Sequence, residues 1–280
     1  MSSLRFAVLV PLVAFAMAGC ARPPKETELA APVTATPAMA RSYVALPEVT
    51  PRHVPRGTLA GRRLVASSAA EIQLRPGEVI LTFDDGPRKG STESILGTLD
   101  AFNVKATFLM VGKMADSYPA VARSVADHGH SIGSHTYGHL NLAKASQEEA
   151  MADVYKGEAA VARALKGSGG ALSPFFRFPY LAETGLVRAS LGEQNLIVLG
   201  VQVDSQDYLK SSPQEVIDRT LARLDKRGSG IILFHDIHPV TAALLPEFLQ
   251  ALADRGYKVV QLVSRDPGPF GEDLVTASTQ

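Results

Sequence analysis

The sequence predicts an α/β protein built around a largely parallel sheet, and two observations carry this prediction. Between about residues 75 and 265, short apolar runs alternate with longer amphipathic stretches, the pattern of successive β/α units. Ionisable residues follow five of these runs, where the carboxyl ends of parallel strands would bring them together. We therefore expect one folded domain with a polar site at the carboxyl edge of its sheet.

Each predicted strand is an apolar run, and an amphipathic segment follows each of the first six. The strands are expected at 79–83, 106–111, 131–133, 175–178, 196–203, 230–234 and 258–262. The helices are expected at 91–102, 118–128, 147–165, 186–194, 213–227 and 242–255. A helix between consecutive strands returns the chain to the same edge of the sheet, which keeps the strands parallel.

The ionisable residues come in the order of these strands. Asp84 and Asp85 follow the first strand, His135 and His139 the third, Arg177 the fourth, Asp204 and Asp207 the fifth, and His235 the sixth. Packing alone does not explain five strands that end in ionisable side chains. We expect these residues to converge on one functional site.

Composition narrows the functional classes. A chain of 280 residues with 46% hydrophobic content can bury one substantial core, so one catalytic domain is expected. Lys plus Arg and Asp plus Glu both total 28, so the bulk charge favours neither nucleic acid nor an anionic membrane surface as a partner. No protein partner is indicated either, and binding is expected to be local to a site.

Residues 1–19 resemble a lipoprotein-type signal peptide. Arg5 supplies a short basic start, and the apolar run that follows is too short to span a bilayer comfortably. The segment Met-Ala-Gly-Cys at 17–20 resembles a bacterial lipobox, in which cleavage leaves Cys20 as the lipid-bearing N-terminus. An ordinary cleaved signal is the alternative, and both export the protein. Ala21 resembles the residue after the cysteine in lipoproteins sent to the outer membrane, facing the periplasm of a Gram-negative cell envelope.

The segments on either side of the predicted domain have different characters. Residues 20–74 are expected to be a tether, because the stretch to about residue 61 is rich in Pro, Ala, Thr and Val without helical or strand periodicity. Residues 75–265 form the predicted catalytic domain, and 266–280 a C-terminal tail. A lipid anchor and tether would hold the domain near a membrane while it works on a nearby polymer.

The segment Leu-Thr-Phe-Asp-Asp-Gly-Pro at 81–87 places two carboxylates where an apolar strand breaks into a turn. Neighbouring side chains diverge there, so one carboxylate can bind a metal while the other faces a water molecule. This division of labour suits metal-assisted hydrolysis. Asp-Asp-Gly-Pro is also a good turn sequence, so a structural role is the alternative.

His135 and His139 are spaced i and i+4, which would place both rings on one face of a helical turn and let them converge on one ion. Two histidines and a carboxylate leave coordination positions open for water and substrate. Such a set is typical of catalytic zinc sites, whereas structural sites are closed by four protein ligands. Surface or capping histidines are the alternative interpretation.

Five segments occur in order and resemble the motifs of the polysaccharide deacetylase family, also called carbohydrate esterase family 4 or the NodB-homology domain. They are Thr-Phe-Asp-Asp-Gly-Pro at 82–87, the pair His135 and His139, Arg-Phe-Pro-Tyr at 177–180, Asp-Tyr at 207–208, and Leu-Phe-His at 233–235. The resemblance covers about residues 75–265 and implies a distorted (β/α)7 barrel. It also implies removal of N-acetyl groups from an amino-sugar polysaccharide, with peptidoglycan N-acetylglucosamine as the leading substrate.

The resemblance implies roles for the residues on the metal side of the site. Asp85, His135 and His139 would hold a divalent metal, with Zn²⁺ as the first expectation and Co²⁺ or related ions tolerated by the same ligands. Asp84 would be the general base that takes a proton from the attacking water. Arg177 would orient Asp84 and balance its charge.

The resemblance also implies the remaining roles. His235 would be the general acid that protonates the leaving amine, and Asp207 would raise its basicity. Tyr180 would contribute its backbone N–H to stabilising the oxyanion. Leu233 would line the pocket for the acetyl methyl group.

Some positions make the pocket shape less predictable than its chemistry. Tyr208 stands where the family commonly has tryptophan, and Leu181 follows the third motif where glycine is common. Asp204 is a weaker candidate for the role of Asp207, and His238 is expected to be peripheral.

Other functions remain open from the sequence. The same chemistry would serve a chitin-oligosaccharide or exopolysaccharide deacetylase, or an esterase that removes O-acetyl groups from xylan. From a different class, the chain could be a glycan-binding lipoprotein without activity. In each case the expected partner is an acetylated glycan.

Overall fold

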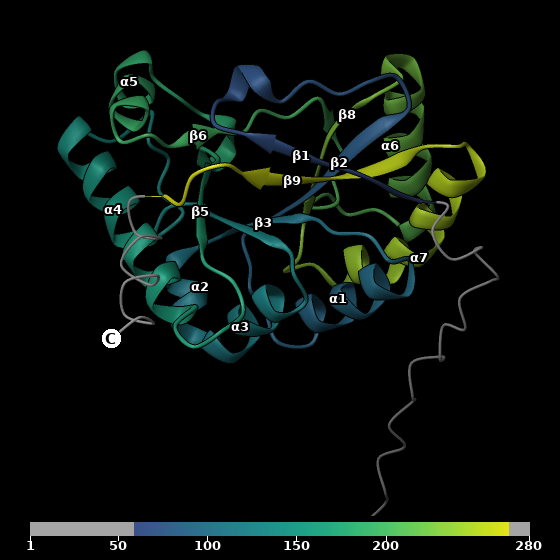
Figure 1. Ribbon diagram of the computed structural model, residues 1–280, viewed down its shortest axis with the longest axis horizontal. Coiled ribbons are helices and arrows are strands. Elements are labelled where there is room, and N and C mark those ends of the chain that lie inside the picture. Colours follow the sequence, from purple (N-terminus) through teal and green to yellow (C-terminus); the bar gives the residue numbers. More distant parts are fainter. Residues whose placement is uncertain (1–58, 269–280) are drawn as a thin grey trace, which may run out of the picture. The chain divides into compact units, whose positions relative to one another are not determined.

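The computed structural model describes residues 59–268. The predicted signal peptide, Cys20, the tether up to residue 58 and the end of the predicted tail lie outside the described residues. Within 59–268, none of the helices combines the length and the apolar character that crossing a bilayer requires. Figure 1 shows these residues as a curved sheet with helices around its outside.

Seven parallel strands form the curved part of the sheet, in the spatial order β7, β8, β2, β3, β4, β5, β6. They are β2 (Glu78–Asp84), β3 (Thr107–Met110), β4 (Ser131–Ser134), β5 (Leu172–Phe176), β6 (Ile197–Val198), β7 (Val203–Asp204) and β8 (Gly230–His235). Among the described strands β6 and β7 do not pair, so the sheet curls without closing there. The expectation of a distorted (β/α)7 barrel is confirmed.

The helices follow the strands as the amphipathic pattern predicts. They are α1 (Ser91–Ala101), α2 (Gly112–Ser117), α3 (Pro119–Asp127), α4 (Gln147–Ala164), α5 (Gly185–Glu193), α6 (Pro213–Arg227) and α7 (Pro239–Asp254). All six expected helices are present, with ends within three residues of the predicted ones. Ser146 and Ser212 cap α4 and α6, each accepting a hydrogen bond from a backbone N–H of the first turn. The short α2 was not predicted.

The N-terminal boundary of the folded domain differs from the sequence prediction. Strand β1 (Ala60–Ala66) pairs in parallel with β9 (Lys258–Ser264), although its residues were assigned to the tether. Leu64 and Ala66 are buried, and Arg62 forms an ion pair with Glu78 at 2.8 Å. The predicted boundary at residue 75 is therefore wrong for 59–74. Because β1 gains its pairing and burial only from β9 and the barrel, its short apolar pattern gave little local signal.

The strand expected at 196–203 is also different, because it is split into β6 and β7, and residues 199–202 belong to neither strand. This break coincides with the open seam of the barrel. The carbonyl oxygens of Leu199 and Gly200, freed from sheet pairing, accept hydrogen bonds from the side chain of Arg177. The interruption therefore provides two hydrogen-bond acceptors for Arg177.

Apolar packing fills the sheet on both faces. Phe83 stacks between Phe108 and Phe234, with ring centroids 5.0 and 5.9 Å apart, in the core shared with the helices. A second cluster joins β1 and β9 to the inner face of the barrel strands. Its buried members are Leu64, Ala66, Ile80, Leu109, Phe175, Ile197, Leu199, Ile231, Val260 and Leu262. Strand β9 pairs with the first residues of β2, so the carboxyl end of β2 is left for polar groups.

Candidate active site

A pocket of about 380 Å³ lies at the carboxyl ends of the barrel strands. Seven of the residues expected from the sequence line it directly, while the buried Arg177 and Asp207 lie behind its wall. The lining residues are Asp84, Asp85, His135, His139, Phe178, Tyr180, Leu181, Asp204, Tyr208, Leu233 and His235. The expected convergence of ionisable residues from separate strands is therefore observed.

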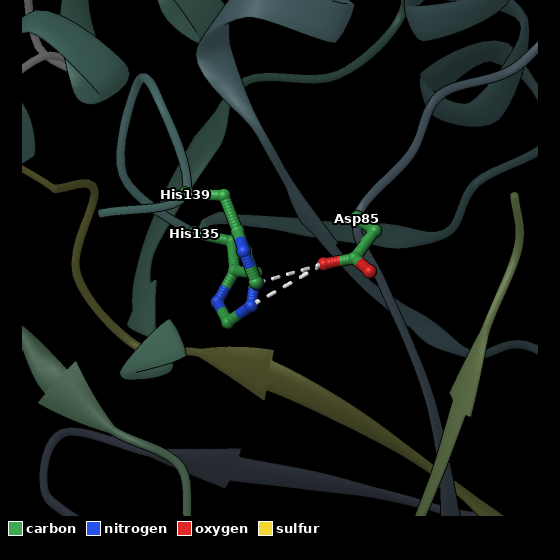
Figure 2. Close-up of side chains that lie close together, drawn as sticks. All are labelled: Asp85, His135 and His139. Atoms are coloured by element: carbon green, nitrogen blue, oxygen red, sulfur yellow. Dashed lines mark ion pairs between the residues drawn. The ribbon is translucent and has the colours of Figure 1, made fainter. Parts of the chain in front are cut away.

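Three potential metal ligands face one another on one side of the pocket (Figure 2). Asp85 Oδ1 lies 3.5 Å from His135 Nε2 and 3.3 Å from His139 Nε2. One ligand atom from each of the three residues lies within 4.8 Å of the other two. Asp85 Oδ1 is buried and accepts no hydrogen bond from any described residue, as a metal ligand requires.

The surroundings of His135 prepare its ring to bind a metal. Its Nδ1 lies 2.7 Å from the carbonyl oxygen of Arg177, which places the ring proton on Nδ1 and leaves the Nε2 lone pair facing Asp85. Burial is the main cause of the lowered pKa of His135, so its neutral form is favoured. A carboxylate and two imidazoles with space beside them fit a divalent cation.

The two histidines do not share a helical turn, contrary to the sequence prediction. They lie in the loop after β4, where Thr136 and His139 have φ angles of 64° and 57°. The backbone N–H of His139 donates to Thr136 Oγ1 at 3.0 Å, which stabilises the bend. A Cβ atom at Gly157 of α4 would lie 2.4 Å from the carbonyl carbon of Thr136, so only glycine permits this close approach. The two histidines therefore converge because the loop between them is bent and packed against α4.

A buried arginine holds the carboxylate of Asp84. Arg177 Nη1 donates to Asp84 Oδ1 at 2.7 Å and to Thr82 Oγ1 at 2.8 Å. Its Nε and Nη2 donate to the carbonyl oxygens of Leu199 and Gly200. Both Arg177 and Asp84 are at most 2% exposed. The guanidinium is thus fully engaged, and Asp84 keeps Oδ2 for the pocket.

On the opposite side, Asp207 holds His235. His235 Nδ1 lies 2.7 Å from Asp207 Oδ1, and the His235 backbone N–H donates to Asp207 Oδ2 at 2.8 Å. Thr241 Oγ1 also donates to Asp207 Oδ2, at 2.5 Å. Burial opposes protonation of His235, but the hydrogen bond and charge of Asp207 outweigh it and raise the pKa to about 9. Nε2 is then the ring nitrogen that can offer a proton to the pocket.

Known proteins include relatives of this chain in sequence and in fold. The family model for polysaccharide deacetylase matches residues 72–197. A chitin deacetylase of Colletotrichum lindemuthianum is 30% identical over 198 residues, which cover 66% of this chain and 78% of that protein. This chain belongs to the polysaccharide deacetylase family. A peptidoglycan deacetylase structure from Bdellovibrio bacteriovorus superposes with a TM-score of 0.68 at 33% identity, over 80% of this chain and 63% of that one.

Among sequence relatives of this family member is the peptidoglycan-N-acetylglucosamine deacetylase PgdA of Listeria monocytogenes. It is 33% identical over 184 residues, which cover 66% of this chain. The same alignment spans only 38% of the length of the Listeria protein. This chain therefore matches only part of the Listeria protein.

The remaining residues of the family motifs also reach the pocket. Tyr180 lies in a turn (Pro179–Leu181), has a φ angle of 59° and is 65% exposed, with its ring centroid 4.6 Å from that of His139. Leu233 is 4% exposed and lines the floor near the ionisable groups. His238 is absent from the described lining, although its ring centroid lies 5.8 Å from that of His235.

Asp236 is a supporting residue of this deacetylase fold that the sequence analysis missed. It is 1% exposed; its Oδ2 accepts a hydrogen bond from Thr92 Oγ1 at 2.6 Å, and its N–H donates to the Asp84 carbonyl oxygen at 3.2 Å. A Cβ atom at Gly86 would lie 2.0 Å from Asp236 Oδ2. Burial raises the pKa of Asp236 to about 7. Its position directly after His235 was the only available signal.

Proposed function

We propose that this chain is a metal-dependent hydrolase that removes N-acetyl groups from an amino-sugar polysaccharide, with peptidoglycan N-acetylglucosamine as its substrate. The observation that supports this most strongly is the arrangement of three groups around one pocket. A carboxylate and two imidazoles fit a metal, Asp84 offers an oriented base, and His235 offers a proton. Amide hydrolysis needs a polarised carbonyl, an activated water and a protonated leaving nitrogen, and these groups supply all three.

A divalent cation, with zinc as the first candidate, would be held by Asp85, His135 and His139 and would polarise the amide carbonyl when bound. Asp84 takes a proton from the attacking water while the oxygen of that water bonds to the carbonyl carbon. Arg177 keeps the Asp84 carboxylate turned toward that water. In our proposal, His235 and its neighbours on the opposite side of the pocket carry out the remaining steps.

His235 gives its Nε2 proton to the sugar nitrogen as the carbon–nitrogen bond breaks, so that acetate and a free amine leave. Asp207 holds the imidazolium in place through Nδ1. The backbone N–H of Tyr180 donates to the oxygen that gains charge during the reaction. Leu233 contacts the acetyl methyl group and keeps that end of the pocket apolar.

The cell envelope is the proposed place of action, because the peptidoglycan deacetylases among the relatives are named for an envelope polymer. We further propose that Cys20 carries a lipid and that the tether leads from this anchor to the domain. The chitin deacetylase relative makes chitin oligomers the second candidate substrate. Acetylated xylan is the third, since ester hydrolysis needs the same base and polarised carbonyl.

The test is acetate release from purified peptidoglycan by the full chain after metal removal and after addition of Zn²⁺ or Co²⁺. Chitin oligomers and acetylated xylan serve as comparators under the same conditions. We expect metal-dependent release that is fastest from peptidoglycan. Retention of the chain on peptidoglycan without any acetate release, with and without metal, would instead support the glycan-binding alternative.

A further inference from the structure

One carboxylate in the pocket wall lacks a cationic partner. Asp204 ends β7 and lines the pocket; its Oδ1 accepts a hydrogen bond from the Gln206 N–H at 2.9 Å. Its Oδ2 accepts one from the Tyr208 hydroxyl at 3.3 Å. Both donors are neutral, and Asp204 forms no ion pair within residues 59–268, whereas Asp84 pairs with Arg177. Among the described residues, the Asp204 carboxylate therefore accepts hydrogen bonds only from neutral donors.

The nearby arginines of α6 bind the main chain around Asp204 and leave its carboxylate unpaired. Arg223 donates to the carbonyl oxygen of Asp204 and, at 2.8 Å, to Gln206 Oε1. Arg219 donates to the carbonyl oxygens of Ser205 and Gln206, at 2.8 and 3.0 Å. These bonds stabilise the loop after β7. The half-buried carboxylate is thus held in the wall and cannot easily turn away from the pocket.

The position of this charge relative to the proposed general acid determines what it can contact. The Tyr208 ring, which donates to Asp204, lies edge-on to His235, with ring centroids 5.5 Å apart. In the proposed function His235 must reach the nitrogen on carbon 2 of the sugar. A sugar bound with this nitrogen at His235 would lie beside the wall that contains Asp204 and Tyr208, and carbon 3, which adjoins carbon 2, can place its substituent against that wall.

We propose that Asp204 makes the pocket select N-acetylglucosamine over N-acetylmuramic acid, an inference that rests on the proposed deacetylase function. N-acetylglucosamine has a hydroxyl on carbon 3 that can donate a hydrogen bond to the carboxylate. N-acetylmuramic acid has a lactyl ether there, which lacks this donor and carries its own carboxylate. Lost hydrogen bonding and like-charge repulsion both act against the muramic sugar.

Glycan strands stripped of their peptides test this selectivity, because each strand contains both sugars in one molecule. Mass spectrometry of the digested strands measures how fast each sugar loses its acetyl group. We compare the unaltered chain with Asp204→Asn, which removes the charge at nearly constant shape. Tyr208→Phe keeps the charge and the ring but removes the hydroxyl. Asp218→Asn removes an equal charge from the exposed face of α6 and is the matched control.

We expect the unaltered chain to deacetylate N-acetylglucosamine faster, and Asp204→Asn to lower the ratio of the two rates by roughly tenfold. Added salt should lower the ratio for the unaltered chain but not for Asp204→Asn, because salt screens only the charge. Tyr208→Phe and Asp218→Asn should keep the preference. An unchanged ratio in Asp204→Asn, equal rates for the two sugars in the unaltered chain, or an equal loss of preference in Tyr208→Phe would each overturn the inference. No acetate from either sugar with the unaltered chain would refute the proposed function itself.

Discussion

Two charged pairs flank the pocket, and they differ in which partner faces it. Asp84 ends β2 and His235 ends the neighbouring β8, and the two residues are paired in register. On the β2 side the carboxylate reaches the pocket, and its cation, Arg177, is buried behind it. On the β8 side the imidazole reaches the pocket, and its carboxylate, Asp207, is buried behind it.

This difference shows how one kind of ion pair can serve opposite chemistry. A carboxylate held by a buried guanidinium can accept a proton from the pocket, while the guanidinium cannot lose one. An imidazole held by a buried carboxylate is favoured in its protonated form and can donate. The identity of the partner that faces the pocket therefore supports the proposed assignment of the base to the β2 side and the acid to the β8 side.

Removing the proposed base should have the largest effect. Asp84→Asn should lower acetate release by roughly 10⁴-fold while the purified protein still binds metal, because Asp85 and both histidines remain. Asp85→Asn is the matched neighbour, and it should weaken metal binding, with activity partly recovered at high metal concentration. Metal content and acetate release are measured for both. If Asp84→Asn loses the metal and Asp85→Asn keeps it, the two roles are reversed.

Removing the proposed acid should have the next largest effect, and it should depend on the leaving group. His235→Ala should slow amide hydrolysis by about 10² to 10³-fold, because the departing nitrogen then lacks its proton donor. An activated ester whose leaving group needs no proton should be hydrolysed at nearly the original rate. Parallel rates on the two substrates are the measurement. Equal losses on both would indicate a structural or metal-binding role for His235.

Removing the carboxylate that supports His235 should shift the pH dependence of the reaction rate. The pKa of His235 is raised from 6.5 to about 9, so the protonated form is lost as pH rises through that value. In Asp207→Asn the raising hydrogen bond and charge are gone, and the alkaline limb of the pH–rate profile should move to lower pH. Profiles at saturating metal measure this. Asp218→Asn is the control, and an unmoved limb in Asp207→Asn would contradict the assignment of His235 as acid.

The same pair should contribute to stability in a pH-dependent way. Because the folded-state pKa of His235 is raised, the stabilisation is fully present below about pH 6.5 and is lost as pH rises toward 9. The unfolding midpoint of the unaltered chain should therefore exceed that of Asp207→Asn most clearly near pH 6. Thermal unfolding at several pH values measures the difference, and a gap that widens with rising pH would have the wrong sign.

A third buried carboxyl sharpens the comparison because it has no cation. Glu158 of α4 is 1% exposed and forms no ion pair among the described residues; the hydroxyl of Ser134 is the one hydrogen-bonding group that acts to lower its pKa. Burial raises its pKa to about 8, far above the usual 4.5. Between about pH 4.5 and 8, Glu158 is therefore protonated in the folded protein and ionised in the unfolded chain. Folding becomes less favourable as the pH rises through this range.

Glu158→Gln should remove this dependence with little effect on activity. The variant should gain on the order of 4 kcal/mol over the unaltered chain at pH 9 and little at pH 5, measured by denaturant unfolding. Glu148→Gln changes an exposed carboxyl of the same helix and serves as the control. An equal difference at both pH values would show that Glu158 is not protonated in the folded state.

Much of the fold follows from local pattern. The strand at 79–83 is apolar except for Thr82, as expected for a central parallel strand covered on both faces, and the structure buries every residue of β2. The helix at 213–227 was predicted to the residue, and in the structure Ser212 and Glu215 form a capping box at its start. Strand β1 was missed because its stability comes from distant partners, β9 and the barrel interior.

The candidate site divides in the same way. The residue types and their order in the sequence determined that two aspartates, two histidines, an arginine and a further histidine would converge, since each follows a strand of a parallel sheet. The family motif favoured Asp207 over Asp204 as the partner of His235, but only the tertiary structure shows the contacts themselves: Asp207 Oδ1 lies 2.7 Å from His235 Nδ1, whereas Asp204 Oδ2 accepts from Tyr208. The tertiary structure also decided that His135 and His139 meet through a loop packed on Gly157, and that Asp236 supports the turn at Gly86. Those contacts join residues far apart in the chain, and the free energy that selects them comes from packing and burial in the folded domain.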